Sequence, residues 1–302
     1  MKKHVIIGAR GSRLGQIQAR SVVAELTGLY PDIELVTTSI TTRGDRQKSV
    51  PLTQMSGDGV FVKEVQEALI EGRIDLAVHS LKDLPVETPP ELLLAAVTER
   101  LDPRDVLVTR GVKLDDLPAG SVIGTGSPRR AAQLLAYRND LKVKPIRGNI
   151  DTRLRKVSAG EVDGIIMAAA ALIRLDWEDR ITEYLPPEHF LPQAGQGALG
   201  IEVRADDQEM KDLVQPLNHE PTWQSVVAER FFLEAMGGGC ATAVTSQGVV
   251  DGDVLKLRGM AVGSDGILYA SEEGSILALE KVARRLAQRL LEMGARQPTD
   301  KE

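Results

Sequence analysis

The sequence predicts an α/β protein of two lobes, followed by a small α+β domain. Apolar, β-branched runs alternate with amphipathic segments over most of the chain, which is typical of α/β domains with a largely parallel sheet. Prolines at 85–90 and 186–192 interrupt this alternation and mark two breaks. After the second break the pattern changes to closely spaced strands with hairpin turns. The 302 residues are enough for two or three domains.

The first lobe is expected to begin with a strand over residues 4–8, which leads through a turn into a helix over 14–30. Ser12 is a suitable N-cap for that helix. A second helix over 61–71 is ended by Gly72. Further strands are expected over 33–41, 76–79 and 92–97.

The segment 100–104 is expected to cross into the second lobe. There, Ser127 and Pro128 are placed to start a helix. A strand over 199–203 follows the second break and is expected to return to the first lobe. Two lobes joined by two crossings favour a hinge, with a ligand site in the cleft. Strands of the second lobe are expected over 106–109, 122–124, 142–146 and 164–167.

The last part of the chain predicts a three-stranded antiparallel sheet with helices. The turns Asp251-Gly252 and Asp265-Gly266 are typical of hairpins. Helices are expected over 221–236 and 276–293, and strands over 245–250, 254–260 and 267–270. The expected domains are 1–98 with 198–216, then 103–192, and finally 217–302.

Cys240 is the only cysteine, and it follows the glycines 237–239. A single thiol excludes an intramolecular disulfide and a zinc site built from several cysteines. Two interpretations stay open for it. Free cysteine is usually a small buried residue, but a thiol on a bare glycine loop is accessible as a nucleophile or an attachment point. The four histidines are not at metal-binding spacing, so no catalytic metal is expected.

Charge and composition restrict the class of protein. A net charge of −6 and a pI near 5.5 argue against broad nucleic-acid binding. The chain shows neither a secretion signal nor an apolar stretch long enough for a membrane span, so we expect a cytoplasmic protein. One free thiol suits a reducing compartment. For the oligomeric state, a monomer is the default expectation.

Many arginines fall at turns and predicted element ends. One interpretation is that they are surface residues with acidic neighbours. The other is a ligand with several carboxylates or phosphates, because guanidinium groups bind such anions in a bidentate way. These arginines are Arg10, Arg13, Arg43, Arg46, Arg129, Arg130, Arg147, Arg153, Arg155 and Arg174.

Two segments have the composition of sites. The buried strand at 76–79 delivers Ser80, Lys82 and Asp83 to its carboxyl end, which faces the ligand crevice in open α/β sheets. Lys82 and Asp83 are either a surface ion pair or, for Asp83, a carboxylate held for a cationic intermediate or for proton transfer. The segments 124–130 and 9–13 combine free backbone N–H groups, hydroxyls and arginines, as anion sites do. Neither is a Walker loop.

With these motifs in order, the chain resembles the porphobilinogen deaminase (hydroxymethylbilane synthase) family over essentially its whole length. The resemblance implies two lobes like those of periplasmic binding proteins, with mixed sheets, and a small third domain. The matching motifs are Ala9-Arg10-Gly11-Ser12, Thr42-Arg43-Gly44-Asp45, His79-Ser80-Leu81-Lys82-Asp83, Gly126-Ser127-Pro128-Arg129-Arg130, Arg147-Gly148-Asn149, Gln193-Ala194-Gly195-Gln196-Gly197 and Gly239-Cys240.

The resemblance also implies an activity and a cofactor. Four porphobilinogen molecules would be condensed head to tail, with loss of ammonia, on a dipyrromethane bound to Cys240 through a thioether. Asp83 and Lys82 would be catalytic, and Asp83 would stabilise an azafulvene-type cation. The implied cofactor contacts are Ser80, Lys82, Asp83, Thr125, Ser127, Arg129, Arg130, Arg147 and Gly148. The implied substrate contacts are Arg10, Ser12, Gln18, Arg147, Arg153, Arg174 and Gln196.

The chain departs from the family pattern in two places. Gln54 and Asp58 stand where the family commonly has lysines, and Ala241-Thr242-Ala243 follows the cysteine. A two-lobed anion-binding protein without catalysis is the alternative by fold, but it would need an export signal and would not need Cys240. A transcriptional effector domain would need a DNA-binding helix pair, for which the predicted elements leave no room.

Overall fold

The computed structural model describes residues 2–42, 59, 61–238 and 242–297. The chain divides into two compact units. Unit 1 contains the described residues up to 101 together with 197–223, and unit 2 contains the described residues of 102–196 and 224–297. The predicted second lobe and the C-terminal sheet therefore both lie in unit 2. The three-domain boundaries expected above stay a prediction.

Unit 1 is built on a five-stranded sheet in the order β2-β1-β3-β10-β4. The first three strands are parallel, whereas β10 is antiparallel to both of its neighbours. The position of β10 confirms that the chain returns to the first lobe. It also confirms the mixed sheet expected from the resemblance and corrects the largely parallel sheet that the alternation favoured. The strands are β1 (His4–Arg10), β2 (Glu34–Ile40), β3 (Leu76–Ser80), β4 (Leu92–Val97) and β10 (Leu199–Arg204).

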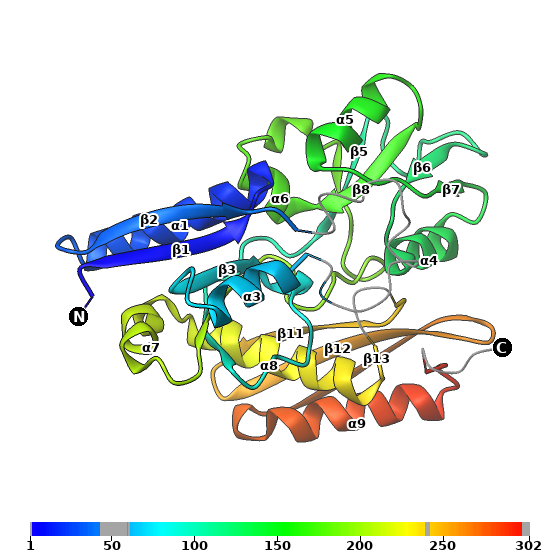
Figure 1. Ribbon diagram of the computed structural model, residues 1–302. Helices are drawn as coiled ribbons and strands as arrows, with labels where there is room; N and C mark the ends of the chain where they lie inside the picture. The colour runs from blue at the N-terminus through cyan, green and yellow to red at the C-terminus, as the bar shows by residue number, and fades with distance from the viewer. Residues whose placement is uncertain (1, 43–58, 60, 239–241, 298–302) are drawn as a thin grey trace. The chain divides into compact units, whose positions relative to one another are not determined.

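Alternating side chains of β1 divide the core of unit 1 between the two faces of the sheet. Val5 and Ile7 pack with helix α1 (Arg13–Leu29) in one cluster, while Ile6 packs with helix α3 (Lys63–Ile70) in another. Figure 1 shows α1 and α3 beside this sheet. Helix α7 (Gln208–Val214) joins the α1 cluster and was not expected from the sequence. The 3₁₀ helices are η2 (Leu81–Asp83) and η4 (Gln215–Leu217).

Unit 2 contains a second mixed sheet, in the order β7-β6-β8-β5-β9. Strand β6 is parallel to β7 and β8, and β5 is antiparallel to β8 and β9. The strand expected over 142–146 ends two residues early, and the two-residue β9 is too short to show a period. The strands are β5 (Asp105–Thr109), β6 (Val122–Gly124), β7 (Lys142–Lys144), β8 (Gly164–Ala168) and β9 (Glu183–Tyr184).

Helices cover both faces of this sheet. Helix α4 (Pro128–Tyr137) packs through Leu134 on one face, and α5 (Ile150–Ser158) and α6 (Ala169–Ile173) pack on the other. Helix α5 corrects the interpretation of Arg153 and Arg155 as turn residues, because both lie within it. A 3₁₀ helix, η3 (Glu178–Arg180), follows α6.

The C-terminal sheet is antiparallel in the order β11-β12-β13, as expected. The third strand is longer than the predicted 267–270. The elements are α8 (Glu220–Ala235), β11 (Thr245–Asp251), β12 (Val254–Gly263), β13 (Gly266–Ser275), η5 (Ile276–Ala278) and α9 (Leu279–Glu292).

This sheet is covered on both faces. A Cβ at Gly259 of β12 would lie 3.0 Å from Phe232 of α8 and 3.0 Å from Leu286 of α9, so both helices pack closely on one face. On the other face, Arg258 donates to the carbonyls of Pro187 (3.0 Å) and Glu188 (2.7 Å). The sheet is therefore hydrogen-bonded to the segment that follows the predicted second lobe.

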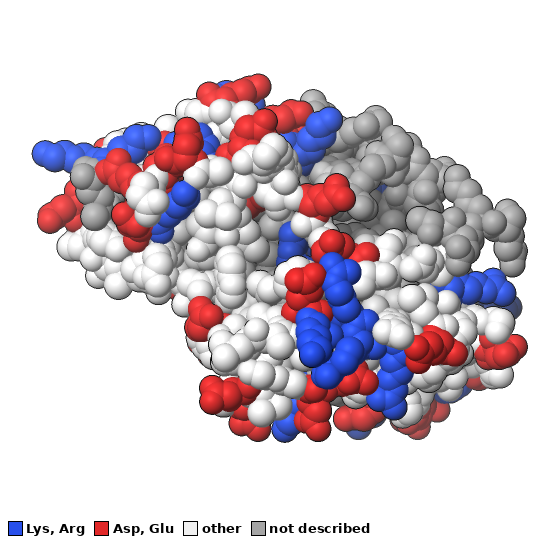
Figure 2. All heavy atoms as spheres, turned by 90° about the horizontal axis from the view of Figure 1, so that it is seen from below, with Lys and Arg blue, Asp and Glu red and all other residues white. Residues whose placement is uncertain are grey.

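The outer side of α9 is charged. Arg284 bonds to Glu280 at 2.8 Å, and Arg289 lies 3.1 Å from Glu272 of β13. Figure 2 shows basic and acidic side chains interleaved on the face seen from below. Exposed pairs of this kind stabilise a helix only slightly, so α9 is held mainly by its buried apolar stripe.

Candidate active site

Parallel strands bring the first group of predicted site residues to one end of the unit 1 sheet. Ala9 of β1 is in register with Val78 of β3, so Arg10 and Ser80 end neighbouring strands on the same side. Predicted site residues at this end are Arg10, Ser12, Gln18, Ser80, Lys82 and Asp83.

The start of α1 is fixed by three polar contacts. Ser12 is the N-cap, and its hydroxyl accepts a hydrogen bond from Gly15 N–H at 3.1 Å, as predicted. Gln18 is buried and donates to the Ser80 hydroxyl at 2.7 Å. Gln16 donates to the carbonyl of Arg10 at 3.0 Å. The predicted residues Ser12, Gln18 and Ser80 are therefore part of one ordered strand-to-helix junction.

Arg10 is placed by two features that the sequence motifs did not indicate. Its guanidinium lies 3.9 Å from the ring centroid of Phe61, which is a cation–π distance. A Cβ at Gly15 would lie 2.5 Å from the Arg10 carbonyl oxygen, so only glycine lets α1 approach β1 this closely. The aromatic residue just before α3 and the glycine in the first turn of α1 are the sequence signals for this arrangement.

Lys82 and Asp83 lie in the 3₁₀ turn η2 directly after β3 and are half-buried. The strand that carries them is anchored from inside, since the buried His79 Nε2 lies 2.9 Å from Glu202 Oε2 of β10. Gln66 of α3 donates to the same carboxylate at 3.0 Å. Among the described residues, the Asp83 carboxylate has no recorded hydrogen bond or ion pair, so its oxygens remain available to a ligand.

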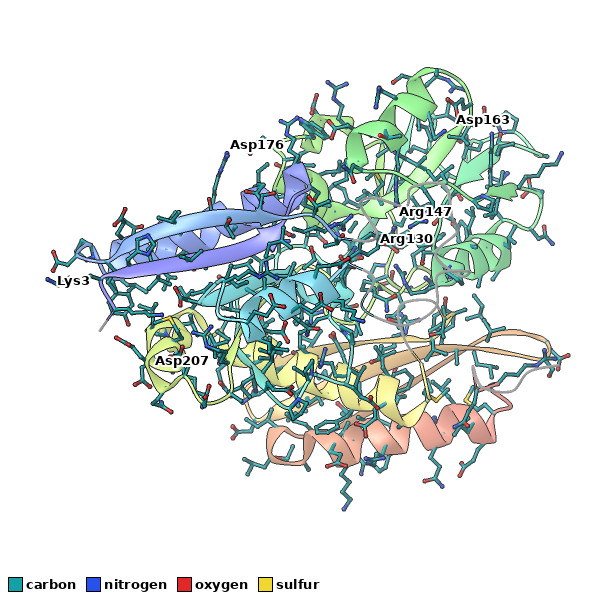
Figure 3. All side chains as sticks on the ribbon, in the orientation of Figure 1. Lys3, Arg130, Arg147, Asp163, Asp176 and Asp207 are labelled. Atoms are coloured by element: carbon teal, nitrogen blue, oxygen red, sulfur yellow. The ribbon has the colours of Figure 1, made fainter. Side chains whose placement is uncertain are left out.

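The unit 2 sheet builds a second polar end in the same way. Ser127 is the N-cap of α4, and its hydroxyl accepts from Arg130 N–H at 3.4 Å, as predicted. Thr125 Oγ1 accepts from Ser127 N–H at 3.2 Å. The Thr125 N–H donates to the Lys144 carbonyl at 3.1 Å, which keeps the segment leading to Arg147 beside this turn. Figure 3 shows Arg130 and Arg147 at one end of the sheet and Asp163 at the other.

Arg129 and Arg130 converge on one carboxylate that sequence reasoning did not select. Asp105, at the start of β5, is fully buried and accepts from Arg129 Nη1 at 2.8 Å and from Arg130 Nη2 at 2.7 Å. Gln196 Nε2 donates to Asp105 Oδ1 at 2.9 Å. Arg129 also donates to the Leu191 carbonyl at 2.6 Å. An acid that directly precedes the apolar run 106–108 was the available signal.

The electrostatics of this cluster favour a bound anion. Burial acts to raise the pKa of Asp105, but the charges and hydrogen bonds of Arg129 and Arg130 outweigh it and hold that pKa well below its usual range. Burial lowers the pKa of Arg129, and the charge of Asp105 opposes this change. Two guanidinium groups and one carboxylate leave a net positive charge. Arg130 Nε is buried and finds no acceptor among the described residues.

Three more predicted residues surround this end of the sheet. Arg153 Nε donates to the Gly148 carbonyl at 2.9 Å, and Gly148 adopts a positive φ of 111°. Arg174 directly follows α6, and burial lowers its pKa to about 10. Arg174 therefore stays a cation at neutral pH, in surroundings where water competes weakly for it.

The predicted residues thus form one group in each unit. Cys240, the segment Gln54–Asp58, Arg43 and Arg46 lie outside the described residues. Within the described part of the chain, no group of three His, Cys, Asp or Glu side chains is arranged to hold a metal ion. No helix among those residues combines the length and apolarity that crossing a membrane requires.

Two α/β sheets whose ends carry hydroxyls, helix N-termini and convergent guanidinium groups are typical of proteins that bind multiply charged anions. Sequence comparison identifies the particular group. Residues 5–212 match the family described as porphobilinogen deaminase, dipyrromethane cofactor binding domain, and residues 223–293 match porphobilinogen deaminase, C-terminal domain. The chain belongs to the porphobilinogen deaminase family.

Close relatives agree over nearly the full length. The porphobilinogen deaminase of Syntrophus aciditrophicus is 45% identical over 294 residues, which cover 96% of each chain. That of Thermus thermophilus is 46% identical over 297 residues, which cover 97% of each chain. Among solved structures, the periplasmic aliphatic sulphonate binding protein of Escherichia coli has a TM-score of 0.42 at 15% identity, covering 78% of this chain and 76% of its own.

Proposed function

We propose that this chain is a transferase that condenses four porphobilinogen molecules head to tail into hydroxymethylbilane, on a dipyrromethane primer attached to Cys240 through a thioether. The observation that carries the proposal is Asp83, a carboxylate on a rigid strand end without a recorded partner among the described residues, in a chain of this family. In tetrapyrrole and haem biosynthesis such a reaction supplies the linear precursor.

The arginine groups suit the acidic ligand. Each pyrrole unit carries an acetate and a propionate, so the growing product accumulates carboxylates. Arg129, Arg130, Arg147 and Gly148, with the hydroxyls of Thr125 and Ser127, are proposed to hold the primer. Arg10, Ser12, Gln18, Arg153, Arg174 and Gln196, together with Arg147, are proposed to hold substrate. Guanidinium groups bind such carboxylates strongly when water is excluded.

The chemistry assigns Asp83 to charge and proton handling. In each condensation the C–N bond of the substrate's aminomethyl group breaks and ammonia leaves. A C–C bond then forms to the free α carbon of the acceptor pyrrole, which loses its proton. Asp83 would stabilise the positive charge left on the substrate carbon and accept that proton. Asp83, Lys82 and Ser80 are also proposed to contact the primer, where Lys82 would contribute a positive charge for one of its carboxylates and Ser80 a hydrogen bond.

The residues present fit the proposed primer. A dipyrromethane supplies a tethered pyrrole with a free α position on which the chain is built. Its carboxylates match the net positive charge around Asp105 and the buried Arg130 Nε, which has no acceptor in the described part of the chain. A covalent tether would also retain the product between successive condensations.

Intact mass spectrometry tests the tether. The purified protein is expected to exceed its sequence mass by one dipyrromethane, and Cys240→Ser is expected to remove the excess. A fully active wild-type protein at its bare sequence mass would refute the proposal. An inactive wild-type protein at its bare sequence mass would instead favour the alternative, a two-lobed anion-binding protein without catalysis.

A second experiment tests Asp83. Asp83→Asn keeps the size of the side chain but removes its charge and basicity, so the variant is expected to carry the primer and bind porphobilinogen while turnover nearly stops. Single-turnover measurement with chemical quench reports the bond-forming step directly. Turnover within about threefold of wild type would end this assignment, because general base groups typically contribute at least 10²-fold.

We further propose that the protein is a cytoplasmic monomer that takes a small-molecule substrate and has no nucleic-acid or membrane partner. The acidic net charge supports the part on nucleic acid. The three domains are proposed at the bounds given above, 1–98 with 198–216, 103–192 and 217–302. Size-exclusion chromatography with light scattering tests the oligomeric state, and limited proteolysis tests the boundaries.

A further inference from the structure

The buried cluster around Asp105 contains a group whose role the proposed chemistry does not use. Asp105 is completely inaccessible to solvent. It is a carboxylate that lies against two arginines, Arg129 and Arg130, which are themselves proposed to bind the carboxylates of the primer. Such a group opposes anion binding by charge alone. Its position among these arginines therefore points to an effect on their geometry.

The contacts of Asp105 divide its two oxygens between the two arginines. Oδ2 accepts from Arg129 Nη1 at 2.8 Å, and Oδ1 accepts from Arg130 Nη2 at 2.7 Å. Oδ1 also accepts from Gln196 Nε2 at 2.9 Å, and Gln196 donates in turn to the Pro103 carbonyl at 2.6 Å. Asp105 is itself fixed in β5, between β8 and β9. The carboxylate thus determines where both guanidinium groups lie.

The two arginines are left in different states. Arg129 is 1% exposed, and its Nε and Nη1 have acceptors in Gln193, Leu191 and Asp105. Arg130 uses its Nη atoms for Asp105, Gln196 and the Ile166 carbonyl. Its buried Nε has no acceptor among the described residues. A buried N–H of a cation without an acceptor costs stability, which a ligand oxygen at that point would restore.

We propose that Asp105 is a positioning residue that holds the Arg129–Arg130 pair so that Arg130 presents Nε to a carboxylate of the primer. Asp105 neutralises one of two adjacent guanidinium charges and leaves the other for the ligand. This inference rests on the proposed function. Arg129 is then a support for the cluster, and Arg130 is the group that touches the ligand.

The experiment measures how fast primer-free protein gains the mass of the dipyrromethane when it is incubated with porphobilinogen. Asp105→Asn should slow loading by about tenfold to a hundredfold, the range known for the removal of residues that orient metal ligands. The amide keeps the shape of the side chain but places an N–H₂ group against a guanidinium donor. Loading at the wild-type rate by folded Asp105→Asn would overturn the proposal.

A matched control separates this effect from general loss of stability. Asp75 of unit 1 is also a buried carboxylate with two cationic neighbours, Lys2 at 2.6 Å and Arg204 at 3.5 Å. It lies just before β3, far along the strand from Ser80. Asp75→Asn should lose comparable stability and load primer at the wild-type rate. Equal slowing in both variants would also overturn the proposal.

Two further variants keep the test decisive. If Asp105→Asn is insoluble, Asp105→Glu keeps the charge but moves the carboxylate by one methylene, and it too should load slowly. In the Arg130→Gln background, Asp105→Asn should add less than about twofold, because it acts through Arg130. If the two substitutions slowed loading multiplicatively, Asp105 would not act through Arg130. A wild-type protein that never gains the mass would instead refute the proposed function.

Discussion

Glu229 connects parts of unit 2 that are remote in sequence. It is a fully buried residue of α8 whose carboxylate accepts Gly195 N–H at 2.6 Å and Gly248 N–H at 2.8 Å. Gly195 lies in the turn after the predicted second lobe, and Gly248 lies in β11. Glu229→Gln keeps the shape of the side chain but replaces one acceptor oxygen with an N–H₂ donor, which then faces a backbone N–H.

The cost follows from these two bonds. One becomes a neutral hydrogen bond of about half the strength, a loss of about 1 kcal/mol. The other is lost and leaves a buried donor unsatisfied, which costs about 1–3 kcal/mol. We therefore expect Glu229→Gln to lower the free energy of unfolding by about 2–4 kcal/mol.

The same helix supplies the control. The Glu234 side chain is 52% exposed, and its nearest basic partner, Arg284, is 4.0 Å away. Glu234→Gln should change the free energy of unfolding by less than about 0.5 kcal/mol.

Urea unfolding followed by tryptophan fluorescence measures both variants. In a Trp223→Phe background, only Trp177 reports, and it packs against the core of unit 2. The slopes with urea should match, so that a shift in midpoint reports stability. A Glu229→Gln variant as stable as Glu234→Gln would refute the argument that these two bonds hold the C-terminal sheet to the preceding turn.

Two further predictions concern unit 1. Gly15→Ala places a Cβ 2.5 Å from the Arg10 carbonyl oxygen and should raise the KM for porphobilinogen at least about tenfold. The control is Gly28→Ala, in open space on the same helix, which should keep KM and add up to about 1 kcal/mol of stability. An unchanged KM for Gly15→Ala would contradict the close-packing argument. Burial acts to raise the pKa of Asp75, but its hydrogen bonds and neighbouring cations outweigh burial and hold that pKa below its usual value. The stabilisation that ionised Asp75 provides is therefore present above pH about 4 and is lost as pH falls through its lower folded pKa. The urea midpoints of Asp75→Asn should consequently fall less steeply below pH about 4 than those of wild type. Parallel curves for the two proteins would argue against the lowered pKa of Asp75.

Local patterns predicted most of the fold. Ser12 and Ser127 were identified as N-caps because a hydroxyl before an amphipathic run satisfies the first free N–H groups. The return of β10 to the first sheet was expected, and its position between β3 and β4 confirms it. These features depend on residues that are neighbours in sequence, or on a strand that needs a partner.

The features that were missed depend on distant pairs. Helix α5 is an exception, because a local signal was present: Ile150, Leu154 and Val157 have the i, i+4, i+7 spacing of an amphipathic helix, and they pack in one core cluster. Asp105 has partners 24, 25 and 91 residues away, and no local period connects them. A lone acid at a strand start is common, so only the packed structure distinguishes it.

Arg129 and Arg130 combine the two interpretations of the arginines, which were acidic neighbours on the one hand and an anionic ligand on the other. Arg129 and Arg130 do have an acidic neighbour, as the first interpretation requires, but the neighbour is buried and is one carboxylate for two guanidinium groups. The excess charge is what the second interpretation requires. A buried pair of one cation and one anion would be neutral and would not need a further charge. This cluster has one excess positive charge, so an added anion stabilises it.

The same comparison separates the roles of the two units. In unit 2, the guanidinium groups of Arg129 and Arg130 are held in place by hydrogen bonds before any ligand binds. In unit 1, Asp83 follows a strand anchored by His79 and Glu202, but its own carboxylate has no recorded partner among the described residues. A group that holds a constant charge benefits from fixed partners, whereas a group that must accept and release a proton in every cycle benefits from having none. The hydrogen bonding around each carboxylate therefore matches the role proposed for it, with Asp105 as a permanent support and Asp83 as the group that reacts.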